Sequence, residues 1–409
     1  SDASIWNAGL IAGKTPLYFA SNSDGHRATV TNSGTIQANS ADGSSSVGNE
    51  GSAIYVYRME MRIVNTEDGV ITANDAYASG IYFSSNSFGT IINAGEISSA
   101  NFWGINLSGM WASYTDLAII RNTGLISGEE GAILGSRSAD TIVNSGTMNG
   151  DVQLAGGDDR YLGSGDGLVL GDILGGLGDD QLVGAGLGDN MDGGSGVDTL
   201  RGNGGTDDLS GGDDGDLIFG GDGNDTLRGD EGDDFLYGDN DDDLIFGGDG
   251  SNFARGGNGN DEYHGGADRD WVYGGYGNDT IKGGAGNDRL YGDQGDDEIE
   301  GGMGRDVIYT GDGADVIVFR DLAESAVGAQ RDVVMDFTVG EDVIDVTGVH
   351  GGALGFVGTG AFTGTGGELR LAEIAGSTRV EIDKDGDGVA DMEIFLKGAV
   401  GLTADDFVL

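Results

Sequence analysis

The stretch GGYGNDTIKGGAGNDRLYGDQGDDEIE, residues 274–300, decides the fold, because it repeats one nine-residue pattern three times. The pattern is GGxGxDxUx, where U is an apolar residue, and it runs without an insertion over 16 nonapeptides from residue 175 to residue 318. Position 1 is glycine in 15 repeats, position 6 is aspartate in 15, and position 8 is apolar in all 16. A fixed period of this kind predicts a solenoid in which each repeat packs on its neighbours.

Each constant position of the nonapeptide has a chemical reason. Glycine allows the positive φ of a tight turn and lets carbonyl oxygens approach an ion without a Cβ in the way. Calcium takes oxygen ligands from carboxylates and carbonyls, and the position 6 aspartate supplies the carboxylate. The next three residues form a short strand whose central apolar residue, such as Leu200, Ile218 or Ile281, points into a thin core. We expect two repeats to complete one coil of 18 residues.

Residues 175–318 are similar to the repeats-in-toxin (RTX) family of calcium-binding nonapeptides. The resemblance implies a parallel β-roll in which repeats n and n+2 share one calcium ion, for about 14 ions in all. The implied ligands are backbone carbonyls of the turn glycines and the position 6 aspartates. These are Asp180, Asp189, Asp198, Asp207, Asp216, Asp225, Asp234, Asp243, Asp261, Asp270, Asp279, Asp288, Asp297, Asp306 and Asp315, with Asn252 as a weaker candidate.

Some turns depart from the pattern. Position 4 is occupied by Leu187, Asp214, Asp241 and Asp268 instead of glycine, and Asn252 replaces the aspartate of its repeat. We expect these turns to bind calcium less tightly. Residues 156–174 lose the nine-residue register, and we interpret them as a degenerate junction with the preceding domain.

Residues 1–155 carry a second pattern, apolar-x-Asn-x-Gly-x-apolar, as in VTNSGTI from Val30 and IINAGEI from Ile91. It predicts an irregular β-helix with one asparagine per coil, in which the side-chain amides form a ladder along the axis. The pattern resembles the right-handed β-helices of secreted adhesins. The expected ladder contains Asn7, Asn32, Asn65, Asn93, Asn122 and Asn144. The whole chain is thus predicted to be all-β: a β-helix, then a β-roll, then a C-terminal β domain.

Residues 319–409 resemble the C-terminal domain of serralysin-type RTX proteases, through VVMDFTVGEDVIDV, DKDGDGVAD and the terminal DDFVL. The resemblance implies an uncleaved signal for type I secretion machinery and export from a Gram-negative bacterium to the cell surface or the medium. Asp383, Asp385 and Asp387 match the start of an EF-hand loop, but Ile394 stands where its bidentate glutamate belongs. We favour an acidic hairpin turn there and keep the three aspartates as weaker calcium candidates.

Composition narrows the possible partners. The chain has 409 residues, 70 acids and 20 bases, for a formal charge of -50. This charge repels nucleic acid and anionic membrane surfaces, so we expect cations or basic surfaces as partners and no nucleic acid. No run approaches the roughly 18 to 20 apolar residues of a membrane helix, so no membrane insertion is expected. The absence of cysteine excludes disulfides and thiolate metal sites.

The outward positions 7 and 9 differ between the two flanks of the roll. The odd-numbered repeats place eight aromatic residues there, and we expect them to form one apolar strip that contacts a partner surface, either a neighbouring subunit or the chain's own C-terminal domain. We call these residues the aromatic strip: Phe219, Phe235, Tyr237, Phe253, Trp271, Tyr273, Tyr291 and Tyr309.

Two functions fit the sequence. The first is a calcium-dependent structural or adhesive surface protein that assembles with itself or binds cell-surface components, including glycans. The alternative is a carbohydrate-active enzyme (lyase, epimerase or hydrolase) with its catalytic acids in the β-helix. No catalytic motif is present, so we expect no enzyme, although Asp75, Asp116, Glu129 and Glu130 could meet in space.

Overall fold

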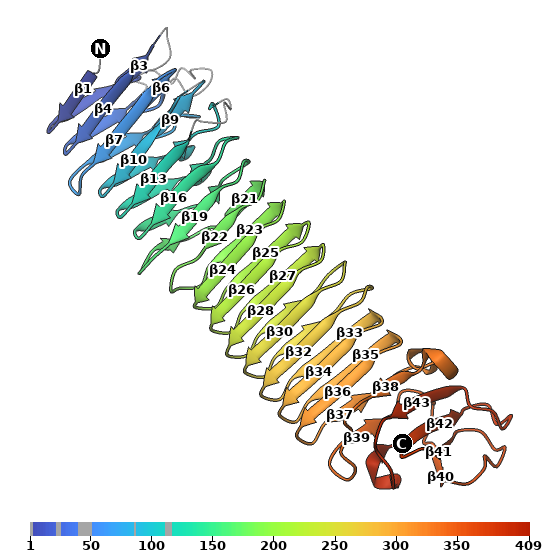
Figure 1. The fold of residues 1–409 in the computed structure, drawn as a ribbon. Helices are drawn as coiled ribbons and strands as arrows, with labels where there is room; N and C mark the ends of the chain where they lie inside the picture. The colour runs from blue at the N-terminus through green and yellow to red at the C-terminus, as the bar shows by residue number, and fades with distance from the viewer. Residues whose placement is uncertain (1–2, 22–25, 40–50, 86, 111–116) are drawn as a thin grey trace. The chain divides into compact units, whose positions relative to one another are not determined.

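The computed structural model describes residues 3–21, 26–39, 51–85, 87–110 and 117–409 (Figure 1). The described residues are almost all strands and turns, which confirms the all-β prediction. The chain divides into two compact units, Ser1–Asp214 and Gly215–Leu409, so the division falls inside the 16 repeats. Among the described residues, no helix is long and apolar enough to cross a membrane.

Unit 1 is a solenoid of parallel strands arranged in three sheets. Sheet A contains β1 (Ala3–Asn7), β4 (Arg27–Asn32), β7 (Glu60–Asn65), β10 (Phe88–Asn93), β13 (Ala118–Asn122), β16 (Asp140–Asn144), β19 (Arg160–Gly163), β22 (Gln181–Val183) and β24 (Thr199–Gly204). Sheet B contains β2 (Leu10–Gly13), β5 (Thr35–Ala38), β8 (Val70–Ala73), β11 (Glu96–Ser99), β14 (Leu125–Gly128), β17 (Thr147–Asn149) and β20 (Leu168–Val169). Sheet C contains β3 (Leu17–Ala20), β6 (Ile54–Tyr57), β9 (Ile81–Ser84), β12 (Trp103–Asn106), β15 (Gly131–Leu134), β18 (Val152–Gln153), β21 (Ile173–Leu177), β23 (Asn190–Ser195) and β25 (Asp208–Asp213).

The Asn-x-Gly pattern forms the corner between sheets A and B. Each sheet A strand from β1 to β16 ends at its asparagine, and the sheet B strand begins three residues later, or five residues later after Asn65. The predicted ladder is present: the side-chain Nδ2 of Asn32 donates to Oδ1 of Asn65 at 2.8 Å, and Asn65 donates to Asn93 at 2.8 Å. A Cβ on Gly95 would lie less than 3.0 Å from the carbonyl oxygen of Gly69, so only glycine fits this stacked corner.

Sheet B ends where the nonapeptides begin. Along sheet A, stacked positions are 22 residues apart at Asn122 and Asn144, 21 apart at Asp159 and Asp180, and 18 apart from Asp180 to Asp198. An 18-residue coil has room for two strands and two turns, so sheet B stops at β20 and only sheets A and C remain. The stretch predicted as a junction, 156–174, therefore forms a complete coil with β19, β20 and the start of β21.

Unit 2 contains two sheets of its own, for which the names A and C are also used. Sheet A contains β26 (Leu217–Asp222), β28 (Phe235–Asn240), β30 (Phe253–Asn258), β32 (Trp271–Tyr276), β34 (Arg289–Gln294), β36 (Val307–Asp312) and β38 (Asp332–Val334). Sheet C contains β27 (Thr226–Glu231), β29 (Leu244–Phe246), β31 (Glu262–His264), β33 (Thr280–Gly286), β35 (Glu298–Gly304), β37 (Val316–Val318), β39 (Val343–Asp345) and β44 (Phe407–Val408). Most of these strands run past position 9 into the next turn, so they are longer than the predicted three residues. The position 8 side chains between the sheets, such as Leu236 and Ile281, are at most 3% exposed.

The C-terminal segment adds a further coil to the roll and then closes it. Strands β38 and β39 pair in parallel with β36 and β37, and the chain then forms β40 (Gly355–Gly358), β41 (Glu368–Ile374), β42 (Ser377–Asp383) and β43 (Met392–Leu396). The antiparallel β41–β42–β43 meander joins sheet A through β43, which pairs with β38. The last strand, β44, pairs with β39, so the C-terminal residues are part of the fold.

We predict that Asn93→Ala destabilises the β-helix by about 2 to 3 kcal/mol, because it leaves buried amide groups on the stacked coils without partners. The Nδ2 of Asn93 donates to Asn122 Oδ1 at 2.8 Å and to Leu125 O at 3.0 Å. Amide hydrogen exchange of β7, β10 and β13 should speed up accordingly. Thr90→Ala, on the outward face of the same strand, is the matched control; equal protection in both variants would contradict the ladder's role.

Candidate calcium-binding turns

The position 6 aspartates form two ladders, one beside each sheet of the roll. In each ladder the backbone N–H of one aspartate donates to Oδ1 of the aspartate one coil further on, as from Asp279 to Asp297 at 2.8 Å. In unit 1 these bonds join Asp180 to Asp198 and Asp189 to Asp207. In unit 2 the sheet A ladder contains Asp216, Asp234, Asn252, Asp270, Asp288 and Asp306, and the sheet C ladder contains Asp225, Asp243, Asp261, Asp279, Asp297 and Asp315.

The second carboxylate oxygen of these residues points into the turn. All the ladder aspartates are at most 5% exposed. A buried carboxylate oxygen without a donor is costly, so each such turn needs an external positive charge. The Oδ2 atoms that are buried without a hydrogen-bond partner include those of Asp180, Asp234, Asp243, Asp261, Asp279, Asp288, Asp297, Asp306 and Asp315.

The turn glycines complete a set of oxygen ligands. A Cβ on Gly274 would lie less than 3.0 Å from both Asp279 Oδ2 and the carbonyl oxygen of Gly292 on the next coil. The same arrangement surrounds Gly256, with Asp261 and Gly274. Carboxylate and carbonyl oxygens from two coils therefore converge on a space that only glycine leaves open. These residues fit calcium, a hard cation that binds 6 to 8 oxygens.

Electrostatics explain why the turns need the cation. Burial, together with the charges of neighbouring aspartates, raises the pKa of Asp243, Asp279 and Asp288 to about 8. Carboxylates on successive coils lie roughly 5 Å apart, so their ionised forms repel one another in a partly dry environment. A divalent ion between each pair removes that repulsion and favours the ionised form.

The turn at Asn252 is filled by the protein itself. Asn252 keeps the ladder, because its Oδ1 accepts from the N–H of Asp234 at 2.9 Å. Its Nδ2, however, stands where other repeats have Oδ2, and a Cβ on Gly247 would lie 2.9 Å from this Nδ2 and 2.7 Å from the hydroxyl oxygen of Tyr263. An amide N–H group cannot ligate calcium. The side chain of Tyr263, at an apolar position of the pattern, thus occupies this turn.

Position 4 tolerates aspartate. Asp214 and Asp241 adopt φ of 74° and 70°, in the left-handed region that glycine occupies in other turns. Aspartate visits this region more readily than other side chains, which explains why these turns keep their shape. Leu187 at the same position is 47% exposed, so it does not enter the core.

The ladders extend beyond the 16 repeats, which the sequence reasoning missed. In unit 1, Asp140 donates its N–H to Asp159, and Asp159 donates to Asp180, at 2.6 and 2.7 Å. In unit 2, Asp306 donates to Asp332 at 2.7 Å and Asp315 to Asp342 at 3.2 Å. Each added aspartate is followed two residues later by a buried apolar residue, as at position 6 of the repeats, and this spacing is the signal that could have identified them.

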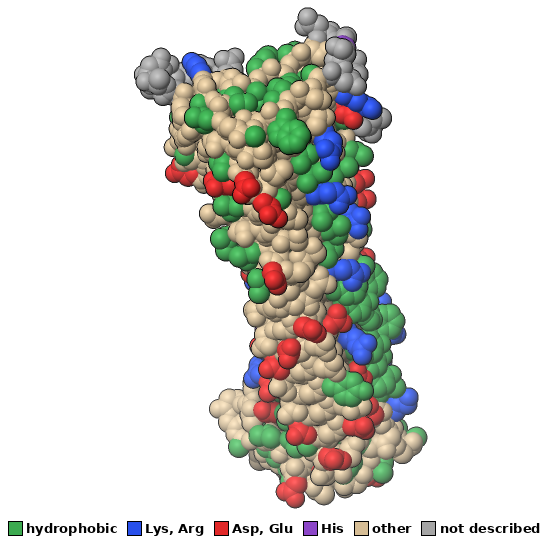
Figure 2. All heavy atoms as spheres, turned by 90° about the vertical axis from the view of Figure 1, so that its left-hand side faces the viewer, with side chains coloured by type: hydrophobic (Ala, Val, Ile, Leu, Met, Phe, Trp, Pro, Cys, Tyr) green, Lys and Arg blue, Asp and Glu red, His purple; other side chains and the backbone are tan. Residues whose placement is uncertain are grey.

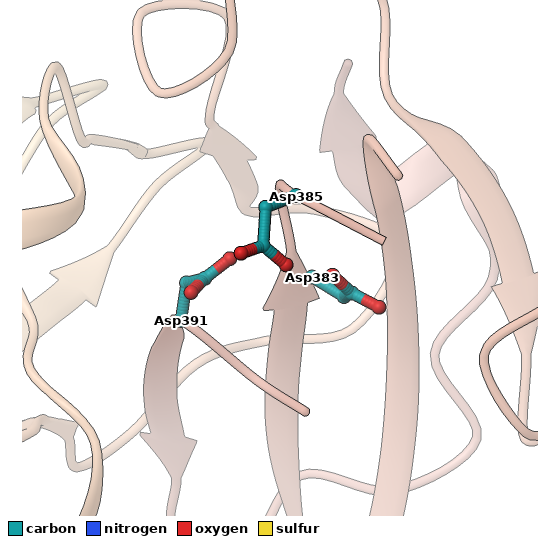
Figure 3. Close-up of side chains that lie close together, drawn as sticks. All are labelled: Asp383, Asp385 and Asp391. Carbon is teal, nitrogen blue, oxygen red and sulfur yellow. The ribbon is translucent and has the colours of Figure 1, made fainter. Parts of the chain in front are cut away.

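The C-terminal acidic loop joins β42 to β43 as a hairpin. One oxygen from each of Asp383, Asp385 and Asp391 lies within 4.8 Å of the others (Figure 3). Asp387 is not in this group, and its Oδ1 accepts from the N–H of Val389 at 2.8 Å. Both oxygens of the buried Asp383 accept backbone N–H groups, from Gly386 at 2.7 Å and Gly388 at 2.9 Å. The loop is thus held by its own turn hydrogen bonds, as an acidic hairpin requires.

The acids considered for catalysis do not converge in the described residues. Asp75 is buried after β8, whereas Glu129 and Glu130 are exposed in the turn between β14 and β15. Both turns join sheet B to sheet C, but two coils separate them, about 10 Å along the axis. Asp116 lies outside the described residues.

The aromatic strip lies along the outer face of sheet A in unit 2. Its rings stack, with centroids 4.5 Å apart for both Tyr273–Tyr291 and Tyr291–Tyr309 and 4.9 Å apart for Phe219–Tyr237. Phe235 and Trp271 are 51% and 44% exposed, so the chain's own C-terminal domain does not cover them.

Comparison with known proteins identifies the repeats. The model of the RTX calcium-binding nonapeptide repeat matches four times, at residues 183–218, 219–254, 255–290 and 282–317. Two solved subunits of the mannuronan C5-epimerase of Azotobacter vinelandii are similar, at 30% and 27% identity. They cover 35% and 33% of this chain and 78% and 90% of their own, with TM-scores of 0.29 and 0.26. No curated protein sequence matches the chain.

We predict that excess chelator at pH 8 unfolds residues 175–318, because one apolar residue per nonapeptide cannot offset chain entropy and carboxylate repulsion. The pKa of Asp243 is raised from 3.8 to about 8 in the fold, so its ionisation opposes the calcium-free roll. Stability of the calcium-free roll is therefore greatest below the ordinary aspartate pKa and is lost as the pH rises toward about 8. Lowering the pH to about 5 in chelator should restore part of the strand signal in circular dichroism.

Calcium added back at pH 8 is the control and should restore the full signal. The calcium affinity itself should fall at low pH, since protons compete for the carboxylates. A strand signal that is unchanged by chelator at pH 8 would contradict the assignment.

Proposed function

We propose that this chain, whose residues 183–317 are RTX calcium-binding nonapeptide repeats, is a secreted structural protein that assembles with copies of itself outside the cell. Calcium folds and stiffens the roll, and the aromatic strip on sheet A is the surface that joins copies. The observation that carries the proposal is an exposed, stacked aromatic face on a chain whose net charge is -50.

The chemistry of this face differs from that of sheet C in the same unit. In unit 2 the outward positions 7 and 9 of sheet A hold eight aromatic residues, two arginines, Leu217 and Val307, with no acid among them. The guanidinium of Arg289 lies 4.7 Å from the ring centroid of Trp271, and a groove of 590 Å³ runs beside Phe235, Phe253 and Trp271. Aromatic residues and arginine are the types that dominate protein interfaces.

The opposite sheet has an ordinary solvated surface. Its outward positions carry Glu262, Glu298 and Glu300, and Lys282 pairs with Glu262 at 2.8 Å. Figure 2 shows hydrophobic and basic side chains together along one edge of the face that it draws, beside a surface with acidic side chains. The aromatic strip and its arginines thus complement the negative charge of a second copy, which is -50 overall.

We expect Phe235→Ser, Trp271→Ser and Tyr273→Ser together to reduce polymer formation in calcium by at least about tenfold, because they remove buried anchors from the contact. Sedimentation and electron microscopy of the full chain provide the measurement. The matched control is Leu244→Ser, Phe246→Ser and Val316→Ser, at outward positions 7 and 9 of sheet C. Calcium-induced folding should persist in both variants.

Equal assembly of the two triple variants would refute the role of the strip. Adding acidic polysaccharides to the same samples tests the alternative: turnover of the glycan without ordered polymers would favour a carbohydrate-active enzyme instead.

The proposal of export rests on the resemblance of residues 319–409 to serralysin-type secretion domains. Deleting residues 399–409 removes η4 (Ala404–Asp406) and β44, and we expect it to abolish type I secretion from a host cell. The purified truncated chain should still gain strand signal with calcium, which separates a lost signal from a lost fold. Normal secretion of the truncated chain would exclude this segment as the signal.

A further inference from the structure

The sheet A ladder does not end with the nonapeptides. The N–H of Asp306, in repeat 15, donates to Oδ1 of Asp332 at 2.7 Å, across 26 residues instead of 18. Strand β38 continues the register of β36, with Val307 opposite Val333 and Ile308 opposite Val334. Asp332 therefore occupies position 6 of one further coil, although no nonapeptide surrounds it.

Both carboxylates of this pair are buried, and each has one oxygen without a hydrogen-bond partner. Asp306 and Asp332 are both 0% exposed. The Oδ2 atoms of both residues are buried and have no hydrogen-bond partner. Two facing carboxylates with unsatisfied oxygens cannot both stay ionised without a cation.

A third carboxylate adds to this charge. Glu324 belongs to the short helix η2 (Leu322–Glu324) and is 8% exposed. Asp332 is close enough to Asp306 and Glu324 for the charges of both to act on it. The nearby Arg320 does not supply the missing charge, because its guanidinium contacts Glu300 at 2.8 Å while only its backbone N–H donates to Glu324.

The other ladder ends differently. Asp342 is the matching residue after Asp315 on sheet C, and its Oδ2 accepts from the N–H of Thr338 at 2.7 Å and from the hydroxyl of Thr310 at 3.1 Å. Position 1 is glycine in every repeat except the last, where it is Thr310. The chain thus supplies donors to Oδ2 of Asp342 on sheet C and none to Oδ2 of Asp332 on sheet A.

We propose that Asp306 and Asp332 bind a calcium ion outside the nonapeptide repeats, with Glu324 as a third negative charge beside it. The ion would connect the last repeat on sheet A to the first strand of the C-terminal domain. The oxygen-only donors select a hard divalent cation. This site is independent of assembly through the aromatic strip.

Asp332→Asn in the full chain tests the proposal. Asn252 shows that asparagine at this position keeps the ladder hydrogen bond while replacing the ligand oxygen with an N–H group. We expect native mass spectrometry of the calcium-saturated protein to show one ion fewer than in the parent. Hydrogen exchange of β38 should also lose its calcium-dependent protection.

Glu324→Gln should raise the calcium concentration that half-protects β38 by roughly tenfold, since it removes one charge near the ion. Asp342→Asn is the matched control and should change neither the ion count nor the protection of β38. The proposal is wrong if Asp332→Asn binds as many ions as the parent and protects β38 equally in calcium. One carboxylate of the pair would then be protonated instead of binding an ion.

Discussion

The structure of the roll depends on one interaction, the hydrogen bond from the backbone N–H of each position 6 aspartate to the carboxylate one coil further on. This bond fixes the register of the coils and places the carboxylates in a buried stack. The same geometry that aligns the coils therefore brings like charges together. A divalent cation between successive carboxylates resolves the conflict, and the glycines leave the space for it.

In the β-helix the stacked side chains are asparagines, which need no ion between them. An asparagine side chain has both a donor and an acceptor, so each amide satisfies the next, from Asn7 to Asn144. The last of these amides donates to the hydroxyl of Tyr161 at 3.2 Å, on the coil whose ladder residue is already Asp159. Unit 1 thus contains a ladder that is complete in itself and the beginning of one that requires calcium.

The ligand turns and the amide ladder could be predicted from the sequence, because their residues recur where the coils stack. Asp332 and Asp342 were missed because insertions lengthen their coils to 26 and 27 residues and break the period, which hides the aspartate-x-apolar spacing that they share with the repeats. The separation of sheets A and B could not be predicted from the Asn-x-Gly pattern, because that pattern spans two strands and the turn between them. The role of the Tyr263 hydroxyl was hidden because position 8 indicates only an apolar core.

The turn filled by Asn252 and Tyr263 affects how the roll responds to limiting calcium. A solenoid behaves as a one-dimensional lattice in which each coil is stabilised by its neighbours. In unit 2 the sheet C ladder consists of aspartates from Asp225 to Asp315, whereas in the sheet A ladder Asn252 keeps the hydrogen bonds but interrupts the row of carboxylate ligands. Coupling between ion sites is thus continuous along one edge and broken along the other. The roll can lose its ions in two blocks along sheet A while sheet C holds the coils in register.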